Sequence, residues 1–306
     1  MDTMMELMPY GPHGEEAGAQ AVTRLQELEK LLSVTAEDSD IGRINHSQGT
    51  PVAVDGETFA LLKAALELGE RTGGALDITI YPVIRAWGFT TDSFQVPEEK
   101  ELEKLLDKVD YQAVQLDGEG QTVTLPAGME LDLGSVAKGY AGDQVIALFR
   151  EAGVTSAIIS LGGNVQTLGA RPDGTPWRVA VRDPSGAGLA GVLEVTDRAV
   201  VTSGGYERYF EADGERYWHI LDPKTGCPAR SGVASATVVG ESGLVCDGLS
   251  TALFILGAEK AEALWRAMGG FDYLLIGEDG SVTITSGIAD QFQAAEDGLA
   301  VTVVTQ

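Results

Sequence analysis

The sequence predicts an α+β fold in which helices pack against mixed sheets. Apolar residues at spacings of three and four mark helices, and alternating apolar and polar runs around Gly-rich turns mark hairpins. These elements interleave without the regular strand–helix–strand order of a doubly wound sheet. No Pro-, Gly- or Ser-rich linker divides the 306 residues, so we expect one compact unit and a single domain over 1–306.

The first half of the chain is expected to be mainly helical. Residues 1–11 alternate enough to predict a short strand. The helical spacing of apolar residues then predicts helices over 15–32, 58–72 and 97–109. The second of these ends at Gly73-Gly74, a natural C-terminal break. Two alternating runs around a Gly-rich turn predict a hairpin over 113–126.

The second half is expected to be richer in strands. A helix begins near Ser135, and two more are expected over 247–256 and 258–268. Strand-like segments precede and follow that helical pair, at 156–163, 177–184, 191–197, 198–204, 206–222, 233–240, 272–287 and 299–306.

Composition excludes several classes of function. The formal net charge of -25 disfavours binding to nucleic acid or to an anionic lipid surface, because like charges repel. A hydrophobic content of 44% supports a sizeable core and argues against disorder. The two cysteines, Cys227 and Cys246, are too few for a disulfide framework. No apolar run reaches the roughly 18 residues of a membrane span, and no signal peptide is visible.

Two Gly-rich segments are candidate ligand sites. Residues 130–143 are expected to form a strand end, a turn at Gly134 and a helix start, where free backbone N–H groups suit an anion. Lys138 would add a charged contact, although such a turn is also a common structural motif. Gly162-Gly163 either lets the backbone approach a ligand or forms a bulge or turn.

The segment 219–228, "HILDPKTGCP", places a histidine before a turn. His219 lies between Trp218 and an apolar pair, and the following Asp-Pro-Lys-Thr-Gly residues suit a turn. A histidine in this position can take the proton from a reacting hydroxyl group. The alternative is a structural strand histidine, and the segment alone does not decide between them.

The segment 246–257 predicts a helix with one apolar and one polar face. Asp247 and Thr251 are four residues apart and share the polar face. A carboxylate and a hydroxyl there could hold Mg²⁺, which prefers oxygen ligands. In the structural alternative Asp247 caps the helix start and Thr251 bonds back to its own helix.

The order of these segments and their amino-acid sequences resemble those of the ApbE family over nearly the whole chain. "MDT" at 1–3, "LLSVTAEDSDIGRIN" at 31–45 and "RTGGALDITIYPVIRAWGF" at 71–89 are similar to that family's early motifs. "DLGSVAKGYAGD", "TSGGYERYF", "HILDPKTGCP" and "DGLSTALFILG" are similar to its later ones. The resemblance implies one ApbE-like flavin transferase domain over 1–306. Members bind FAD and Mg²⁺ and transfer FMN to a threonine or serine of an acceptor protein, releasing AMP.

The resemblance also implies roles for individual residues. His219 would be the catalytic base, with Asp222 as an orienting neighbour. Asp247 and Thr251 would hold Mg²⁺ through their side chains and Ser135 through its backbone carbonyl. The positions implied for FAD are Met1, Ala75, Leu76, Asp77, Asp132, Lys138 and Leu221.

The chain departs from the family pattern at two positions of the implied flavin site. Thr35 stands where members often carry an aromatic residue, so one wall of the site would be thinner. Leu76 stands where phenylalanine is usual, which weakens ring stacking but keeps apolar contact. Met1, at the chain start, is either natural or an added initiator.

Other functions stay open at this point. The same residues would serve an FAD pyrophosphatase that gives FMN and AMP, while a non-catalytic FAD-binding protein would not need His219, Asp247 and Thr251 together. A conventional flavin redox enzyme is disfavoured, because no GxGxxG fingerprint follows the first strand. The acceptor cannot be identified from sequence. The resemblance implies work outside the cytoplasmic membrane, behind a leader absent from this chain.

Overall fold

The computed structural model describes residues 3–91, 93–186, 188–295 and 300–306. The chain divides into two compact units, each made of separate stretches of sequence. The first unit comprises Met1–Gln26, Val136–Gly204 and Arg230–Gln306, and the second comprises Glu27–Ser135 and Gly205–Ala229. The expectation of one domain over 1–306 stays a prediction.

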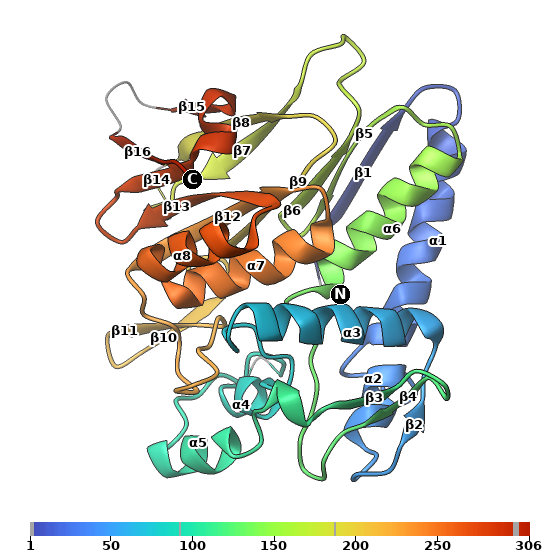
Figure 1. Cartoon of the computed structure of the whole chain (residues 1–306), viewed down its shortest axis with the longest axis vertical. Helices are drawn as coiled ribbons and strands as arrows, with labels where there is room; N and C mark the ends of the chain where they lie inside the picture. The colour runs from blue at the N-terminus through green and yellow to red at the C-terminus, as the bar shows by residue number, and fades with distance from the viewer. Residues whose placement is uncertain (1–2, 92, 187, 296–299) are drawn as a thin grey trace. The chain divides into compact units, whose positions relative to one another are not determined.

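The α+β class is confirmed by the helices and strands along the chain (Figure 1). The helices are α1 (Gly14–Leu32), α2 (Asp40–Asn45), α3 (Gly56–Arg71), α4 (Tyr81–Ala86), α5 (Glu99–Leu106), α6 (Ala137–Glu151), α7 (Gly243–Leu256) and α8 (Ala258–Met268), with 3-10 turns η1 (Tyr111–Ala113) and η2 (Ser286–Gln291).

Most of the strands lie in the second half of the chain, and those of the second unit are two to four residues long. In chain order they are β1 (Met5–Tyr10), β2 (Val52–Ala53), β3 (Gln115–Asp117), β4 (Thr122–Thr124), β5 (Ser156–Leu161), β6 (Asn164–Leu168), β7 (Trp177–Arg182), β8 (Leu189–Val195), β9 (Ala199–Gly204), β10 (Tyr209–Ala212), β11 (Glu215–Trp218), β12 (Val233–Gly240), β13 (Phe271–Gly277), β14 (Val282–Thr285), β15 (Phe292–Ala294) and β16 (Val301–Val304).

The first unit is built on a mixed sheet. Among the described residues this sheet has eight strands, in the order β1-β5-β6-β9-β12-β13-β14-β16. β12 pairs antiparallel with β9 and β13, whereas β14 and β16 are parallel. The helices α6 and α7 pack on strands β6, β9 and β12. Figure 1 shows α6, α7 and α8 against one face of this sheet.

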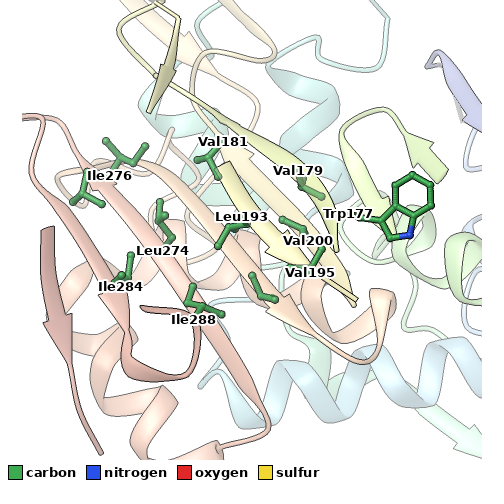
Figure 2. Packing of buried hydrophobic residues seen from close by; sticks show 12 residues of the cluster. Trp177, Val179, Val181, Leu193, Val195, Val200, Leu274, Ile276, Ile284 and Ile288 are labelled. Carbon is green, nitrogen blue, oxygen red and sulfur yellow. The ribbon is translucent and has the colours of Figure 1, made fainter. Parts of the chain in front are cut away.

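An apolar core lies on the other face of that sheet (Figure 2). There the smaller sheet β15-β8-β7 contributes Leu193 and Val195, and the larger sheet contributes Val200, Leu274 and Ile284. The strands alternate in side-chain direction, so residues such as Val200 and Val239 face this core together. Because both of its faces are buried, the larger sheet is a rigid support for the helices that pack on it.

The second unit contains the sheet β2-β4-β3, the hairpin β10-β11 and helices α2 to α5. Its apolar cluster includes Val83, Trp87, Phe89, Leu102 and Leu221. The indole N–H of Trp87 donates to the carbonyl of Gly226 at 2.7 Å, so this buried ring is tied to the turn that follows His219 in sequence. In the described part of the chain, no helix is long and apolar enough to span a bilayer.

Several sequence predictions are confirmed and one helix boundary is wrong. The helices expected over 15–32 and 58–72 and the hairpin over 113–126 are present. Gly162-Gly163 forms the turn of a hairpin, with φ angles of 61° and 87° that favour glycine. The helix expected from Asp247 begins at Gly243, because Ser242 caps it by accepting a hydrogen bond from Val245.

We predict that Leu274→Ala destabilises the first unit by about 2–5 kcal/mol, because it removes a fully buried side chain and leaves a cavity. Urea unfolding followed by circular dichroism measures the change. Val303→Ala is the control, since Val303 is 47% exposed and should change stability by about 0.5 kcal/mol or less. Equal effects of the two substitutions would contradict this picture of the core.

Candidate functional site

The residues predicted for the site divide between the two units. Lys138, Asp247 and Thr251 belong to the first unit. The second unit carries the others that the structure describes, which are Ala75, Leu76, Asp77, Asp132, Ser135, His219 and Leu221. Met1 lies outside the described residues. Each unit is therefore considered by itself.

Asp247 is buried in the first unit, where helices α6 and α7 meet. Its side chain comes from the second turn of α7, and the residue is 3% exposed. Oδ2 accepts a hydrogen bond from the backbone N–H of Gly139 at 2.8 Å. Oδ1 lies 3.7 Å from Nζ of Lys138. The alternative that Asp247 caps the start of its own helix is wrong, because Ser242 does so, and the structure brings two predicted site residues, Asp247 and Lys138, together.

Burial raises the pKa of Asp247 above its ordinary value. The charge of Lys138 and the hydrogen bond from Gly139 oppose this shift, because both favour the ionised carboxylate. Because desolvation is the larger effect, burying the ionised carboxylate of Asp247 costs free energy. A cation bound to it would remove that cost.

Thr251 lies one turn further along α7 and joins a chain of hydroxyl groups. Ser250 donates to the carbonyl of Asp247 at 2.9 Å, which uses its single hydroxyl proton. Ser203 lies 2.8 Å from Ser250, so in a fully paired network it donates to Ser250. Toward Thr251, at 3.4 Å, Ser203 can then only accept. This order directs the Thr251 proton to Ser203 and leaves the lone pairs of Thr251 for another partner.

The chemistry of these atoms fits Mg²⁺. Asp247 supplies carboxylate oxygen and Thr251 a hydroxyl oxygen, which are ligands that magnesium accepts alongside water and phosphate. The buried side chain of Asn164 lies beside this carboxylate, and hydrogen bonding from it helps to lower the pKa of Asp247 against the larger effect of burial.

The expected anion site at the start of α6 is partly occupied by the protein itself. The Gly139 N–H is in the first turn of α6, and the carboxylate that it binds is that of Asp247. A helix start does attract negative charge here, as predicted. The charge that it attracts comes from α7 in this structure. No group of three or more His, Cys, Asp or Glu side chains suited to a metal is found among the described residues.

The triplet Ala75-Leu76-Asp77 is buried in the second unit. Leu76 is 2% exposed, so its apolar contacts are with the protein core. Oδ1 of Asp77 accepts from the backbone and hydroxyl of Thr79, and Oδ2 accepts from the backbone of Tyr111. Burial raises the pKa of Asp77, and these hydrogen bonds oppose the shift. The triplet can thus offer a ligand its backbone more readily than its side chains.

Asp132 is fixed through its backbone to the segment that follows this triplet. Its N–H donates to the carbonyl of Ile78 at 2.8 Å. Asp132 is half-buried, and its negative charge contributes to the raised pKa of Tyr81, after the larger effect of burial. Ser135 is also half-buried, in the turn before α6. Leu221 packs in the apolar cluster of this unit and is 4% exposed.

His219 directly follows the hairpin β10-β11. Its ring Nδ1 lies 3.1 Å from the carbonyl oxygen of Arg208, whose carbonyl also accepts from the His219 backbone. In the tautomer with the proton on Nδ1, Nδ1 donates to Arg208 and Nε2 is the nitrogen that can accept a proton. The carbonyl of Arg208 is one group that can orient the ring, and the orienting role of Asp222, whose carboxylate accepts from the backbone of Lys224, stays a prediction.

His219 contacts one ring, Phe89, of an aromatic cluster. Phe89 meets the imidazole edge-on, with ring centroids 6.4 Å apart. Phe210 lies against Phe89 and stacks on Phe94 and Tyr217. This packing limits the orientations open to the half-buried imidazole, which suits a side chain with a positional role.

The first unit also holds residues that sequence reasoning did not single out. Ser203 orders the hydroxyl chain, and Gln166 donates to the carbonyl of Gly139 at 2.9 Å. Asp143 binds the start of α7 through three hydrogen bonds. Asp143 and Ser203 lie within segments 130–143 and 198–204, whose wording resembled known motifs, and that was the one available signal. Their partners are distant in sequence and could not be read from it.

The chain matches the ApbE family model over residues 1–275. The FAD:protein FMN transferase of Treponema pallidum is 38% identical over 294 residues, covering 90% of this chain and 81% of that protein. The enzyme of that name from Escherichia coli K12 is 31% identical over 267 residues, covering 85% and 76%.

Solved structures show the same fold. The ApbE protein of Thermotoga maritima superposes with a TM-score of 0.87 at 31% identity, over 94% of this chain and 99% of that one. The flavin transferase ApbE of Vibrio cholerae gives 0.86 at 29% identity, over 95% and 96%. Fold and site together define an α+β protein of the flavin transferase type. The chain belongs to the ApbE family.

We predict that Asp247→Asn stabilises the metal-free protein at neutral pH. The native pKa of Asp247 is raised from its ordinary value of 3.8, so the folded state holds this proton more tightly than the unfolded state. Stability therefore falls as pH rises from 3.8 through the native pKa, and the loss persists above it. Asparagine keeps an acceptor for Gly139 and removes the buried charge.

Thermal unfolding in EDTA, over a series of pH values, measures this effect. The variant should melt higher than the parent at pH 7, and the difference should vanish under acid conditions. Asp213→Asn is the control, because Asp213 is exposed and both residue types tolerate its positive φ of 52°. A lower melting temperature for Asp247→Asn at pH 7 would show that the ionised carboxylate is net stabilising.

Proposed function

We propose that this protein is a magnesium-dependent FAD:protein FMN transferase, which moves FMN from FAD onto a threonine or serine hydroxyl of an acceptor protein and releases AMP. Membership of the ApbE family and relatives with this activity in their names support the enzyme class and the flavin substrate. The observation that carries the magnesium proposal is the buried Asp247 carboxylate, with the hydroxyl of Thr251 one helical turn further along α7.

The reaction exchanges one phosphorus–oxygen bond for another. The acceptor hydroxyl oxygen attacks the FAD phosphorus nearest the riboflavin. The bond from that phosphorus to the oxygen shared with the AMP phosphate breaks, and AMP leaves with that oxygen. The hydroxyl proton passes to a base. No electron is gained or lost by the flavin, so the chain needs no redox partner for this step.

Residues of the first unit are suited to the phosphate part of FAD. Asp247 and Thr251 would hold Mg²⁺ through oxygen atoms. The backbone carbonyl of Ser135, which belongs to the second unit and precedes α6 in sequence, is proposed as a further ligand. When bound, the metal supplies positive charge against the pyrophosphate and the leaving AMP. Lys138 carries a positive charge close to Asp247 and can pair with phosphate oxygens.

Residues of the second unit are suited to proton transfer and to the flavin. With Nδ1 donating to Arg208, Nε2 of His219 is the ring nitrogen with the lone pair that would accept the hydroxyl proton. The remaining proposed flavin positions are Ala75, Leu76, Asp77, Asp132 and Leu221, together with Met1. Burial of the described side chains Leu76 and Leu221 favours backbone contacts at those two positions.

The direct test is incubation of the protein with FAD, Mg²⁺ and candidate acceptor proteins. Intact-protein mass spectrometry should show FMN added to one acceptor, with an equal amount of AMP in solution. A matched acceptor with its target threonine or serine changed to alanine should stay unlabelled. Release of FMN and AMP without labelling of any acceptor would instead identify an FAD pyrophosphatase, and unchanged FAD would indicate a binding protein.

We predict that His219→Ala slows acceptor labelling by roughly 10²–10⁴, the usual contribution of a general base, while FAD affinity changes only a few-fold. His219→Asn should be similarly slow, because asparagine can hydrogen-bond but cannot accept the proton at neutral pH. Single-turnover labelling and flavin fluorescence titration separate the two effects.

The two variants can also refute the assignment. Labelling at the parent rate in both would make His219 a structural residue after the hairpin. Loss of FAD binding in both would place His219 in the cofactor site and require another base.

A further inference from the structure

The N-terminal turns of α6 and α7 approach each other at two glycines. A Cβ atom placed on Gly139 would lie 2.1 Å from the carbonyl oxygen of Gly243. One placed on Gly243 would lie 2.6 Å from the carbonyl oxygen of Gly139 and 1.8 Å from Nε2 of Gln166. No side chain larger than glycine fits between the two helix starts without moving the backbone.

Asp143, on α6, binds the start of α7 at this contact. Its carboxylate accepts hydrogen bonds from the backbone N–H groups of Gly243 at 2.6 Å and Leu244 at 3.0 Å. It also accepts from the hydroxyl of Ser242 at 3.0 Å. The two N–H groups belong to the first turn of α7 and have no partner within their own helix. The half-buried carboxylate of Asp143 satisfies both and complements the positive end of the helix.

The arrangement is reciprocal. Asp247, on α7, accepts from the Gly139 N–H in the first turn of α6, while Asp143, on α6, accepts from the first turn of α7. Each helix thus carries the carboxylate that caps the other. The rotation and the position of α7 relative to α6 are fixed from both sides, because either capping bond would break if α7 turned about its axis.

The capped end and the proposed magnesium ligands lie on one face of α7. Gly243, Asp247 and Thr251 follow one another at intervals of four residues, so they form a single row along the helix. Anchoring Gly243 to Asp143 therefore sets the direction in which Asp247 and Thr251 project. A small rotation of α7 would move both oxygen ligands together.

We propose that Asp143 is a positioning residue for magnesium, which holds α7 in the rotation that presents Asp247 and Thr251 to the metal. This inference rests on the magnesium part of the proposed function. Asp143 does not itself contact the metal in this account. It acts through the backbone of α7, and partners of this kind typically change metal affinity by about 10–100-fold when they are lost.

The test is calorimetric titration of Mg²⁺ into FAD-free protein, at a temperature at which every variant is folded. Asp143→Ala should weaken Mg²⁺ binding by about 10-fold or more. Asp143→Asn keeps one acceptor oxygen for the α7 backbone but sets an NH2 donor against the second N–H, so Mg²⁺ binding should be intermediate between Asp143→Ala and the parent. Hydrogen exchange adds a metal-free readout, since the amides of Gly243 and Leu244 should exchange faster in Asp143→Ala.

A matched control separates positioning from general destabilisation. Asp55 caps α3 by accepting a hydrogen bond from the backbone of Glu57, and α3 carries none of the proposed site residues. Asp55→Ala should lower the melting temperature yet leave Mg²⁺ affinity unchanged. Parent-like Mg²⁺ affinity in Asp143→Ala would overturn the proposal, as would equal weakening by Asp55→Ala.

Asp247→Ala in the same assay shows which part of the account fails. If it abolishes Mg²⁺ binding while Asp143→Ala does not weaken it, the metal assignment stands and the positioning role is wrong. If Asp247→Ala binds Mg²⁺ like the parent, the magnesium assignment in the proposed function is wrong, and the positioning proposal falls with it.

Discussion

The contact between the starts of α6 and α7 is the constraint on which the rest of the candidate site depends. Two carboxylates, the half-buried Asp143 and the buried Asp247, each accept hydrogen bonds from the backbone of the opposite helix. Burying an ionised group is costly, and both pKa values are raised by burial. The hydrogen bonds across the contact offset part of that cost, and the charge of Lys138 offsets more of it at Asp247. The ionised carboxylate of Asp247 is therefore destabilising in its buried position, and a bound cation would reduce that cost.

The larger sheet of the first unit supplies the base for this contact. Strand β6 brings Asn164 and Gln166, and β9 brings Ser203, to the face on which α6 and α7 pack. The opposite face of the same sheet is filled by an apolar core that gives it rigidity. In the second unit, the contact of Phe89 with His219 and the carbonyl of Arg208 beside Nδ1 limit the orientations of the imidazole ring.

Much of this could be predicted from the sequence, because periodicity and turn chemistry are local signals. The long helices, the hairpin at 113–126 and the pairing of Asp247 with Thr251 on one helix face are of that kind. The six-residue helices α2 and α4 span less than two turns and give no clear period. The true start of α7 was signalled by Ser242, a good capping residue before an apolar run, but Asp247 offered a competing interpretation.

The partners of the buried polar groups could not be predicted. Asp247 and Gly139 are 108 residues apart, and only the folded chain brings them together. Asp77 was expected to face a ligand, yet both of its oxygens bind neighbouring segments of its own unit. The order of donors from Thr251 through Ser203 to Ser250 depends on distances between two elements that are separated in sequence.

The claim that one carboxylate serves both the helix contact and the metal is tested most directly by the amide NMR signal of Gly139. Its N–H binds Oδ2 of Asp247, so a cation at that carboxylate must change its environment. Titration with Mg²⁺ should shift the signal saturably in the parent and leave it unmoved in Asp247→Asn. A Gly139 signal that stays fixed in the parent, while Mg²⁺-dependent turnover of FAD proceeds, would place the metal elsewhere and contradict the account.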